Sequence, residues 1–143
     1  MREILFKAKR LDNGEWVEGY YQKRKNAFEN DEHLIFRCES YHTWEYVEVD
    51  PETLCQYTGL TDKNGNKIWE NDICDRYETF PEIVKQRNGD WTLDYSYAYK
   101  EEYGYNYCNL GFYVCDRSCV KVIGNIFDNP ELLETDKILE RMG

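Results

Sequence analysis

The segment QYTGLTDKNGNKIWENDIC, residues 56–74, concentrates the residue types that could bind a metal ion or a phosphate. If Asp62 is taken as the first position of a calcium-binding loop, residues with side-chain oxygen atoms stand at alternating positions, at Asp62, Asn64 and Asn66. Such a loop needs glycine at its sixth position and glutamate at its twelfth, where this chain has Lys67 and Ile73. A phosphate loop needs the pattern GxxxxGK followed by Ser or Thr, and the segment does not have it. We therefore interpret the segment as structural.

What the segment does contain is the signal for a tight hairpin. Asn64-Gly65 accepts positive φ and favours a two-residue turn. The flanking strands are expected to include Thr58 to Leu60 and Lys67 to Trp69. Trp69 and Ile73 are expected to point into the core, because large apolar side chains beside a turn are usually buried.

Six cysteines are the next candidates for chemistry, as zinc ligands or as disulfides. They stand at positions 38, 55, 74, 108, 115 and 119, without a CxxC pair. A tetrahedral zinc site needs a second close pair or a nearby histidine, and His33 and His42 are far from Cys115 and Cys119 in sequence. We expect no metal, no cofactor and six reduced thiols, most of them buried as small apolar groups. If zinc were bound, Cys108, Cys115 and Cys119 would be the ligands to test.

Aromatic residues form the most regular pattern in the chain. They occupy alternate positions from Trp91 to Tyr99, apart from Leu93, and the alternation resumes after residues 100–102. A period of two places side chains on one face of a strand. With a loop at 100–102, the predicted hairpin has three facing pairs: Tyr99 with Tyr103, Tyr97 with Tyr105, and Tyr95 with Tyr107.

Two interpretations of these tyrosines stay open. Aromatic side chains on a sheet can stack on bases or sugars. Alternatively, the pattern is a half-buried hairpin or a subunit contact, where tyrosine is enriched. We favour the second, because Lys100 stands among Asp94, Glu101 and Glu102 and the segment lacks the cations of a nucleic-acid platform. The candidate interaction surface is Tyr95, Tyr97, Tyr99, Tyr103, Tyr105 and Tyr107.

These residues need strands to position them, and the chain is mostly strands and turns. Short apolar runs bounded by turn residues predict strands over residues 3–9, 15–21, 33–38, 43–49, 82–87 and 91–97, with two more inside 111–127. The turns are expected at 11–14 and at Asn88-Gly89, and pairing should stop at Pro51, which has no amide to donate. Such short strands suggest an antiparallel barrel or sandwich.

Only the C-terminus predicts a helix. Asn129 can cap it, Pro130 suits its first position, and 14 residues extend from Pro130 to the end of the chain. Its apolar residues fall on one narrow face, at Leu132, Ile138, Leu139 and Met142.

Composition limits the class of protein. A length of 143 residues fits one ordinary domain or two very small ones. The chain is 16% aromatic, which is typical of a folded protein, and it carries a net charge of −10. The N-terminal residues lack the pattern of a secretion signal, and no apolar run reaches the roughly 18 to 20 residues needed to span a bilayer. We expect a soluble cytoplasmic protein without a membrane partner.

Three runs of the sequence resemble the YopX family, small proteins encoded by bacteriophages and prophages of Gram-positive bacteria. They extend from Arg2 to Tyr20, from Val49 to Ile73, and from Val122 to Glu134, in the family's order. Where the family commonly has glycine before a strand, this chain has Asn71, which tolerates the same left-handed conformation. The Tyr-rich segment 95–107 has no counterpart in the family pattern.

The resemblance implies a fold for the later part of the chain and no established activity. With it, we expect a mainly β protein: an N-terminal β-hairpin region at 1–55, an SH3-like, partly open β-barrel at 56–130, and a C-terminal helix or tail at 131–143. The two β parts are expected to pack as one unit. The implied location is the cytoplasm of a bacterial host.

Two classes of function remain from the sequence. The first is a non-enzymatic accessory protein that binds an unknown host or phage protein, or that forms a homo-oligomer. The alternative is a nucleic-acid-associated module, or an acidic DNA mimic acting on a DNA-binding protein. An enzyme is not expected: acid pairs such as Glu78 and Glu82 are common in so acidic a chain, and no catalytic set stands out.

The charge yields a first prediction: duplex DNA does not bind appreciably at physiological salt. Tight binding of a phosphate backbone relies on lysine and arginine, and this chain has a charge of −10 without a concentrated basic run. A gel shift with a random duplex should show no complex at micromolar protein. Sub-micromolar affinity that weakens steeply with added salt would contradict the prediction.

Overall fold

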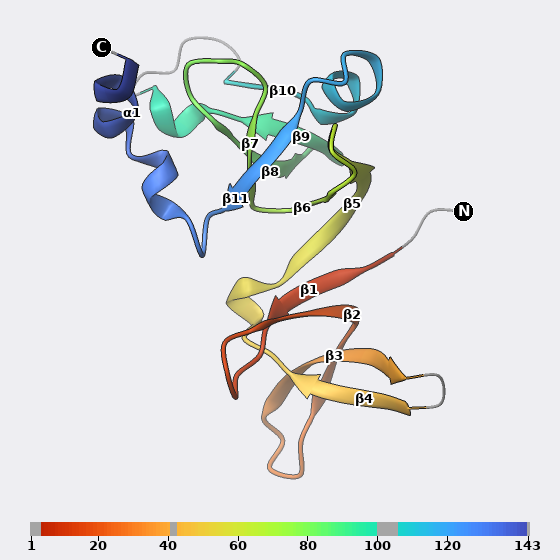
Figure 1. The fold of residues 1–143 in the computed structure, drawn as a ribbon. Helices are drawn as coiled ribbons and strands as arrows, with labels where there is room; N and C mark the ends of the chain where they lie inside the picture. Colours follow the sequence, from red (N-terminus) through yellow and green to blue (C-terminus); the bar gives the residue numbers. More distant parts are fainter. Residues whose placement is uncertain (1–3, 41–42, 100–105, 143) are drawn as a thin grey trace. The chain divides into compact units, whose positions relative to one another are not determined.

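The computed structural model describes residues 4–40, 43–99 and 106–142 (Figure 1). The chain divides into two compact units, Met1–Tyr57 and Thr58–Gly143. Strand β5 (Cys55–Thr61) runs across the boundary between them.

The first unit is an antiparallel sheet. Its strands are β1 (Phe6–Lys9), β2 (Trp16–Lys25), β3 (Asp31–Ser40), β4 (Thr43–Glu48) and the start of β5, in the order β4-β3-β2-β1-β5. One face carries the core of the unit, formed by Ala8, Val17, Ile35, Val47 and Val49.

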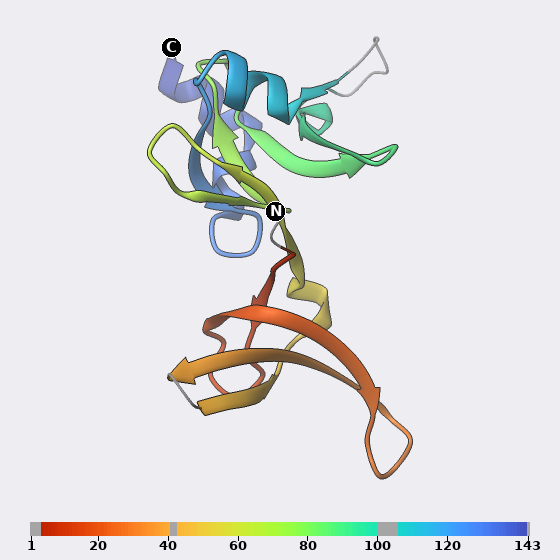
Figure 2. The same cartoon turned by 90° about the vertical axis from the view of Figure 1, so that its right-hand side faces the viewer.

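Strand β2 changes partner along its length. Its first half pairs with β1, where Phe6 lies opposite Gly19, and its second half pairs with β3, beginning at Tyr20 opposite Phe36 (Figure 2). A Cβ atom at Gly19 would come within 2.3 Å of the Phe36 carbonyl oxygen. Only glycine therefore permits this close approach of β2 and β3.

A short 3-10 helix, Pro51–Thr53, connects β4 to β5. The Asp50 side chain accepts a hydrogen bond from the Glu52 amide at 3.0 Å and caps the helix. The Thr53 hydroxyl donates to the Asp50 carbonyl at 2.7 Å and accepts from the Lys9 amide at 2.8 Å, which ties the helix to β1. As predicted, the strand before Pro51 ends ahead of it.

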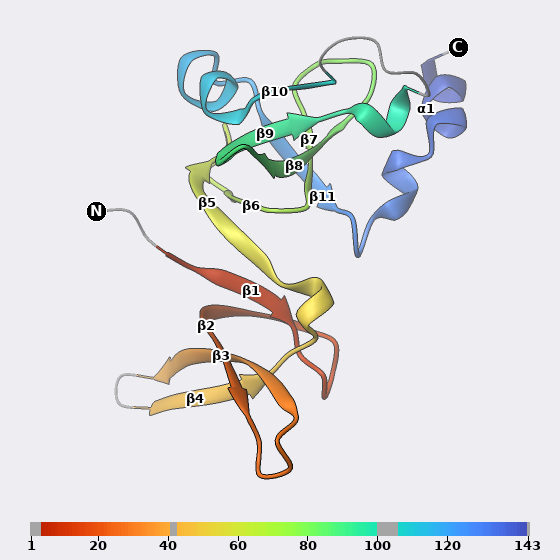
Figure 3. The ribbon, with the colours of Figure 1, turned by 180° about the vertical axis from the view of Figure 1, so that it is seen from behind.

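The second unit is a second antiparallel sheet. Beyond β5, its elements are β6 (Lys67–Trp69), β7 (Asp72–Asp75), β8 (Glu82–Arg87), β9 (Asp90–Asp94), β10 (Tyr107–Asn109) and β11 (Lys121–Asn125), and five of them form the sheet β10-β9-β8-β7-β11 (Figure 3). Its core contains Ile68, Cys74, Val84, Trp91, Leu93, Leu110 and Val120. Helix α1 (Thr135–Met142) follows at the C-terminus.

The predicted fold class is confirmed: the protein is mainly β, with antiparallel hairpins and one short C-terminal helix. The second sheet is open, because β10 and β11 are its edges in the part of the chain that the structure describes. The prediction that both β parts pack as one unit stays a prediction.

The segment that resembles an ion-binding loop is a hairpin, as predicted. Asp62 is 6% exposed, and its carboxylate accepts hydrogen bonds from the amides of Asn64, Asn66 and Val122, each at 2.9 Å. Burial raises the pKa of Asp62, but these backbone hydrogen bonds outweigh it and hold the pKa below its ordinary value. The oxygen atoms that could have bound calcium instead fasten the β5–β6 hairpin to β11.

The side chains around this hairpin also follow the prediction. Trp69 is 5% exposed and Ile73 is fully buried. Asn71 has a φ of 70°, so asparagine does replace the family's glycine in the left-handed conformation.

Two predicted strands are wrong in detail. The strand expected over 91–97 ends at Asp94, because the Asp94 carboxylate accepts from the amide (3.0 Å) and hydroxyl (2.6 Å) of Ser96 and turns the chain into a 3-10 helix, Ser96–Ala98. The run at 112–115 is a π-helical turn, Phe112–Asp116, whose first amide donates to the Asn109 side chain at 2.8 Å. Strand β10, before this turn, begins at Tyr107, which the predicted tyrosine hairpin also places in its second strand.

The predicted C-terminal helix is broken into two. Residues Pro130–Leu133 form a 3-10 turn, Glu134 is extended, and α1 follows. Asn129 does not cap the turn; its side-chain oxygen accepts from the Asn125 amide at 3.2 Å and closes the loop after β11. Of the residues on the predicted apolar face, Ile138 is buried, whereas Leu139 is 53% exposed.

The hairpin yields a prediction about stability. Gly65 has a φ of 84°, and no atom lies within 4 Å of the position that a Cβ would occupy. Replacing Gly65 with valine therefore introduces backbone strain without a steric clash, and should lower the free energy of unfolding by about 1–3 kcal/mol. Calorimetric melting measures the loss.

Gly65→Asn is the matched control, because asparagine tolerates positive φ and should lose much less stability. A valine variant as stable as the wild type would show that the turn does not need glycine. If that variant also lost a binding partner, the turn would be a recognition loop.

Candidate functional site

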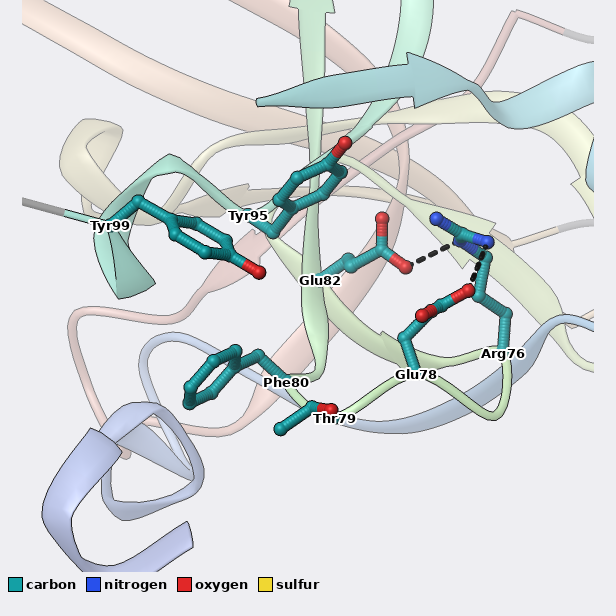
Figure 4. A pocket seen from close by; sticks show the side chains of 7 residues that line it. All are labelled: Arg76, Glu78, Thr79, Phe80, Glu82, Tyr95 and Tyr99. Atoms are coloured by element: carbon teal, nitrogen blue, oxygen red, sulfur yellow. Dashed lines mark hydrogen bonds and ion pairs between the residues drawn. The ribbon is translucent and has the colours of Figure 1, made fainter. Parts of the chain in front are cut away.

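A cavity of about 270 Å³ opens beside the start of β8 in the second unit. Three segments form it: the loop between β7 and β8, the first residue of β8, and the chain that follows β9 (Figure 4). Its lining residues are Arg76, Glu78, Thr79, Phe80, Glu82, Tyr95 and Tyr99.

A buried ion pair forms one wall. The Glu82 side chain is 1% exposed, and its Oε1 lies 2.5 Å from Nε of Arg76. The two atoms face each other as an ion pair rather than as an aligned hydrogen bond. Arg76 also contacts Glu78 through Nη1 at 3.1 Å, and its guanidinium lies 4.3 Å from the ring centre of Tyr113. Two carboxylates and one aromatic ring therefore fix the orientation of Arg76.

The environment of Glu82 makes its carboxyl group unusually basic. Burial raises its pKa to about 7, although the charge of Arg76 acts in the opposite direction. The Cys108 thiol donates a hydrogen bond to Oε2 of Glu82 over 3.7 Å. Burial, together with the Glu82 charge, raises the pKa of Cys108 to about 12. The thiol is thus neutral at physiological pH and is a poor nucleophile.

Aromatic rings form the facing wall. The ring centres of Phe80 and Tyr99 are 5.9 Å apart with planes at 80°, and those of Tyr95 and Tyr99 are 5.9 Å apart at 71°. These are edge-to-face contacts, which hold the rings in fixed orientations. In Figure 4 the three rings lie on one side of the cavity, Arg76 and Glu78 on the other, and the Glu82 carboxylate between them.

The tyrosines predicted as an interaction surface do not form one face. Tyr95 and Tyr99 line the cavity, whereas the Tyr97 hydroxyl donates to the Pro81 carbonyl at 2.7 Å, and burial raises its pKa to about 12. Tyr107 lies in β10, with the Arg87 guanidinium 4.7 Å from its ring centre. Tyr103 and Tyr105 lie outside the described residues.

The predicted pairing of Tyr95 with Tyr107 is wrong by one position. Tyr107 lies opposite Asp94, and the Tyr95 amide donates to the Asn106 carbonyl at 2.9 Å. The 3-10 helix that begins at Ser96 ends the period-two pattern, so Tyr97 and Tyr99 are not strand residues. A binding role for these tyrosines stays a prediction.

Sequence reasoning missed a second aromatic surface, in the first unit. We call it the aromatic face: Tyr20, Phe36, Trp44 and Tyr46, on the side of the sheet opposite the core. Phe36 lies opposite both Tyr20 and Tyr46 in the strand register, and its ring stacks on Trp44 at 4.8 Å and on Tyr46 at 4.6 Å. An open groove of about 520 Å³ lies along Tyr20, Phe36 and Trp44.

Three of the four side chains are about half exposed: Tyr20 at 56%, Trp44 at 50% and Tyr46 at 49%. A signal for this surface exists in the run TWEYVEV. Trp44 and Tyr46 alternate with Val47 and Val49, which are core residues, so the period of two already assigns the aromatics to the opposite face.

All six cysteines are free thiols. Within residues 4–40, 43–99 and 106–142, no three His, Cys, Asp or Glu side chains gather closely enough to hold a metal ion. The absence of a bound metal from the protein stays a prediction. In the same residues, no helix has the length and apolar character needed to cross a bilayer.

Comparisons with known proteins identify similar chains. The family model for the YopX protein matches residues 5–134. The crystal structure of protein EF1440 from Enterococcus faecalis has a TM-score of 0.52 and 24% sequence identity, covering 94% of this chain and all of that one (100%). YopX from Bacillus subtilis has a TM-score of 0.50 and 16% identity, covering 94% and 98%. These two structures support the fold alone, and among curated proteins none matches.

The buried carboxyl group yields a prediction about pH. Because the pKa of Glu82 is raised from 4.5 to about 7, the folded protein holds a proton in this window that the unfolded chain releases. The free energy of unfolding should therefore fall as pH rises from about 4.5 to about 7, by up to about 3 kcal/mol. The lowered pKa values of Asp62 and Asp94 change the free energy of unfolding only at more acidic pH.

Urea unfolding at pH 5 and pH 8 measures the change, with Glu82→Gln as the test variant. Glutamine does not titrate, so the variant should lose most of the difference between the two pH values. Glu52→Gln, at an exposed position, is the matched control and should behave as the wild type does. Equal pH dependence in all three proteins would mean that Glu82 has an ordinary pKa.

Proposed function

The chain belongs to the YopX family, and we propose that it is a non-enzymatic accessory protein of a bacteriophage or prophage that binds a protein of the host or the phage. The observation that carries this proposal is the aromatic face of the first unit. Its Tyr20, Trp44 and Tyr46 side chains are about half exposed and lie next to one another around Phe36.

The chemistry of the aromatic face is that of a protein interface. Tryptophan and tyrosine are enriched in interfaces and contribute most to their binding energy when they become buried. Trp44 and Tyr46 are already oriented by stacking on Phe36, so they lose little conformational freedom when a partner covers them. Isolated exposed apolar residues are ordinary on protein surfaces, but a contiguous group is not.

The strand that carries two of these aromatics is an edge strand. β4 is the last strand of the first sheet in the described residues. At its C-terminal end the outer edge meets the segment after β1, because the Leu11 amide donates to the Glu48 carbonyl at 3.1 Å and Arg10 bridges Val49; at Trp44 and Tyr46 that edge has no neighbouring strand in the described residues. Edge strands are commonly protected from pairing by lysine or proline, and β4, with the sequence TWEYVE, has neither. We therefore propose that the partner contributes an extended segment that pairs with β4 and places apolar side chains against Trp44 and Tyr46.

The proposed location is the cytoplasm of a bacterial host, where both host and phage proteins are available as partners. The alternative, an acidic DNA mimic, would act on a DNA-binding protein through carboxylates. The identity of the captured protein and the side chains needed for capture separate the two functions.

The proposal predicts that capture of the partner requires Trp44. Tagged wild-type protein is used to capture partners from an extract of a lysogenic Gram-positive host, and the captured protein is identified, purified and titrated back. Trp44→Ser should weaken binding about tenfold or more, because an aromatic residue at the centre of an interface commonly contributes over 1 kcal/mol. Amide hydrogen exchange in β4 should become slower when the partner binds.

Phe28→Ser is the matched control. Phe28 is 84% exposed in the same unit and lies outside the aromatic face, so its loss should leave both binding and melting temperature unchanged. Equal binding by wild type and Trp44→Ser, with no protection of β4, would refute the proposed surface. A partner whose binding depends on carboxylates instead would support the DNA mimic.

A further inference from the structure

The cavity beside β8 has features that the proposed partner surface does not use. It lies in the second unit, and its volume of about 270 Å³ is below the range of about 300–1,000 Å³ that is typical of ligand pockets. A space of this size accommodates one small organic molecule or one long side chain.

The charges around the cavity favour a cation. Two carboxylates, Glu78 and Glu82, contact one guanidinium, that of Arg76. Arg76 is already compensated by both carboxylates, so an anion entering the cavity would meet an excess of negative charge. A second cation would instead restore the balance between charges of opposite sign.

The aromatic wall favours the same charge. The faces of aromatic rings carry negative electrostatic potential, and a cation within about 6 Å of a ring centre is attracted to them. Phe80, Tyr95 and Tyr99 present rings at steep angles to one another, at 80° and 71°. Rings at such angles offer an entering cation several surfaces at once, as in sites that bind alkylammonium groups.

We infer that this cavity binds an organic ammonium ion, held between the aromatic wall and the carboxylates of Glu82 and Glu78. The ion is either a small free amine or the side chain of a lysine in another protein, because both present the same group. The cavity is separate from the aromatic face, and either site can exist without the other.

Such a site responds to pH through Glu82. The charged and titratable groups that face this carboxyl group are Arg76, Glu78, Cys74, Cys108, Tyr95 and Tyr97. The pKa values of the two thiols and of the two phenols are raised, so these four groups stay neutral below pH 8. Arg76 remains charged throughout. Between pH 6 and pH 8, ionisation of Glu82 is thus the change that strengthens binding of a cation.

The test is an NMR titration of the full chain with three probes. They are n-butylammonium, Nα-acetyl-lysine amide, and Nα-acetyl-norleucine amide, which is a neutral analogue of the second. By the affinity per atom typical of small ligands, the two ammonium probes should bind with a Kd on the order of 1 mM. Tighter binding of the lysine amide indicates a protein side chain as the natural ligand, and tighter binding of n-butylammonium indicates a free amine.

The expected result is saturable shifts of cavity residues with both ammonium probes, several-fold tighter at pH 8 than at pH 6, and none with the norleucine amide. Glu82→Gln should weaken binding about tenfold at pH 8 and remove the pH dependence, while Glu52→Gln binds as the wild type does. Because Glu82→Gln can also affect folding, Tyr99→Leu is a second variant. Tyr99 is 50% exposed, so its loss should weaken binding and leave the fold intact.

Three outcomes would each overturn the inference. The first is binding of the norleucine amide equal to that of the lysine amide, and the second is unchanged affinity for the ammonium probes in both variants. The third is the absence of a saturable shift at a probe concentration 20-fold above the expected Kd.

Discussion

A carboxylate buried at the first position of β8 constrains the local structure of the second unit. Removing a charge from water is costly unless an opposite charge accompanies it, and Glu82 is 1% exposed. The loop after β7 therefore has to return over the start of β8, so that Arg76 can reach this carboxylate. Arg76 is in turn held against Tyr113, in the π-helical turn. The cavity is the space that this loop leaves between the ion pair and the aromatic rings.

Two buried carboxylates of this unit have opposite roles because their partners differ. Asp62 accepts three backbone amide hydrogen bonds, its pKa is lowered, and it remains ionised as a fixed structural link. Glu82 is paired with one arginine and one thiol, its pKa is raised, and its charge changes near neutral pH. Burial raises the pKa of both groups, and their partners decide the outcome. Three backbone amides outweigh burial at Asp62, whereas one arginine and one thiol do not outweigh it at Glu82.

Local signals in the sequence predicted the hairpins well. Asparagine and glycine tolerate positive φ, so their presence predicted this conformation at Asn64-Gly65, Asn71 and Asn88-Gly89. The structure has a residue with positive φ at each of these three places. The segment after Trp91 could not be predicted in this way, because its period-two pattern favours a strand that continues to Tyr99. What ends the strand is the Asp94 side chain, whose position depends on burial and on its ion pair with Arg87 from β8. The cavity likewise depends on contacts between segments that are distant in sequence.

The hydrogen bond from the Val122 amide to Asp62 joins residues 60 positions apart, and this separation has a consequence during synthesis. At roughly 5–20 residues per second, about 3–12 s pass between the translation of Asp62 and that of Val122. During this time β7 can pair with β8, but its other edge has no partner until β11 has left the ribosome. The first unit, whose β2, β3 and β4 are joined by short turns, has no such delay among those strands. The nascent chain therefore passes through a stage in which one edge of β7, the strand that carries Ile73, is open to wrong pairing with other chains.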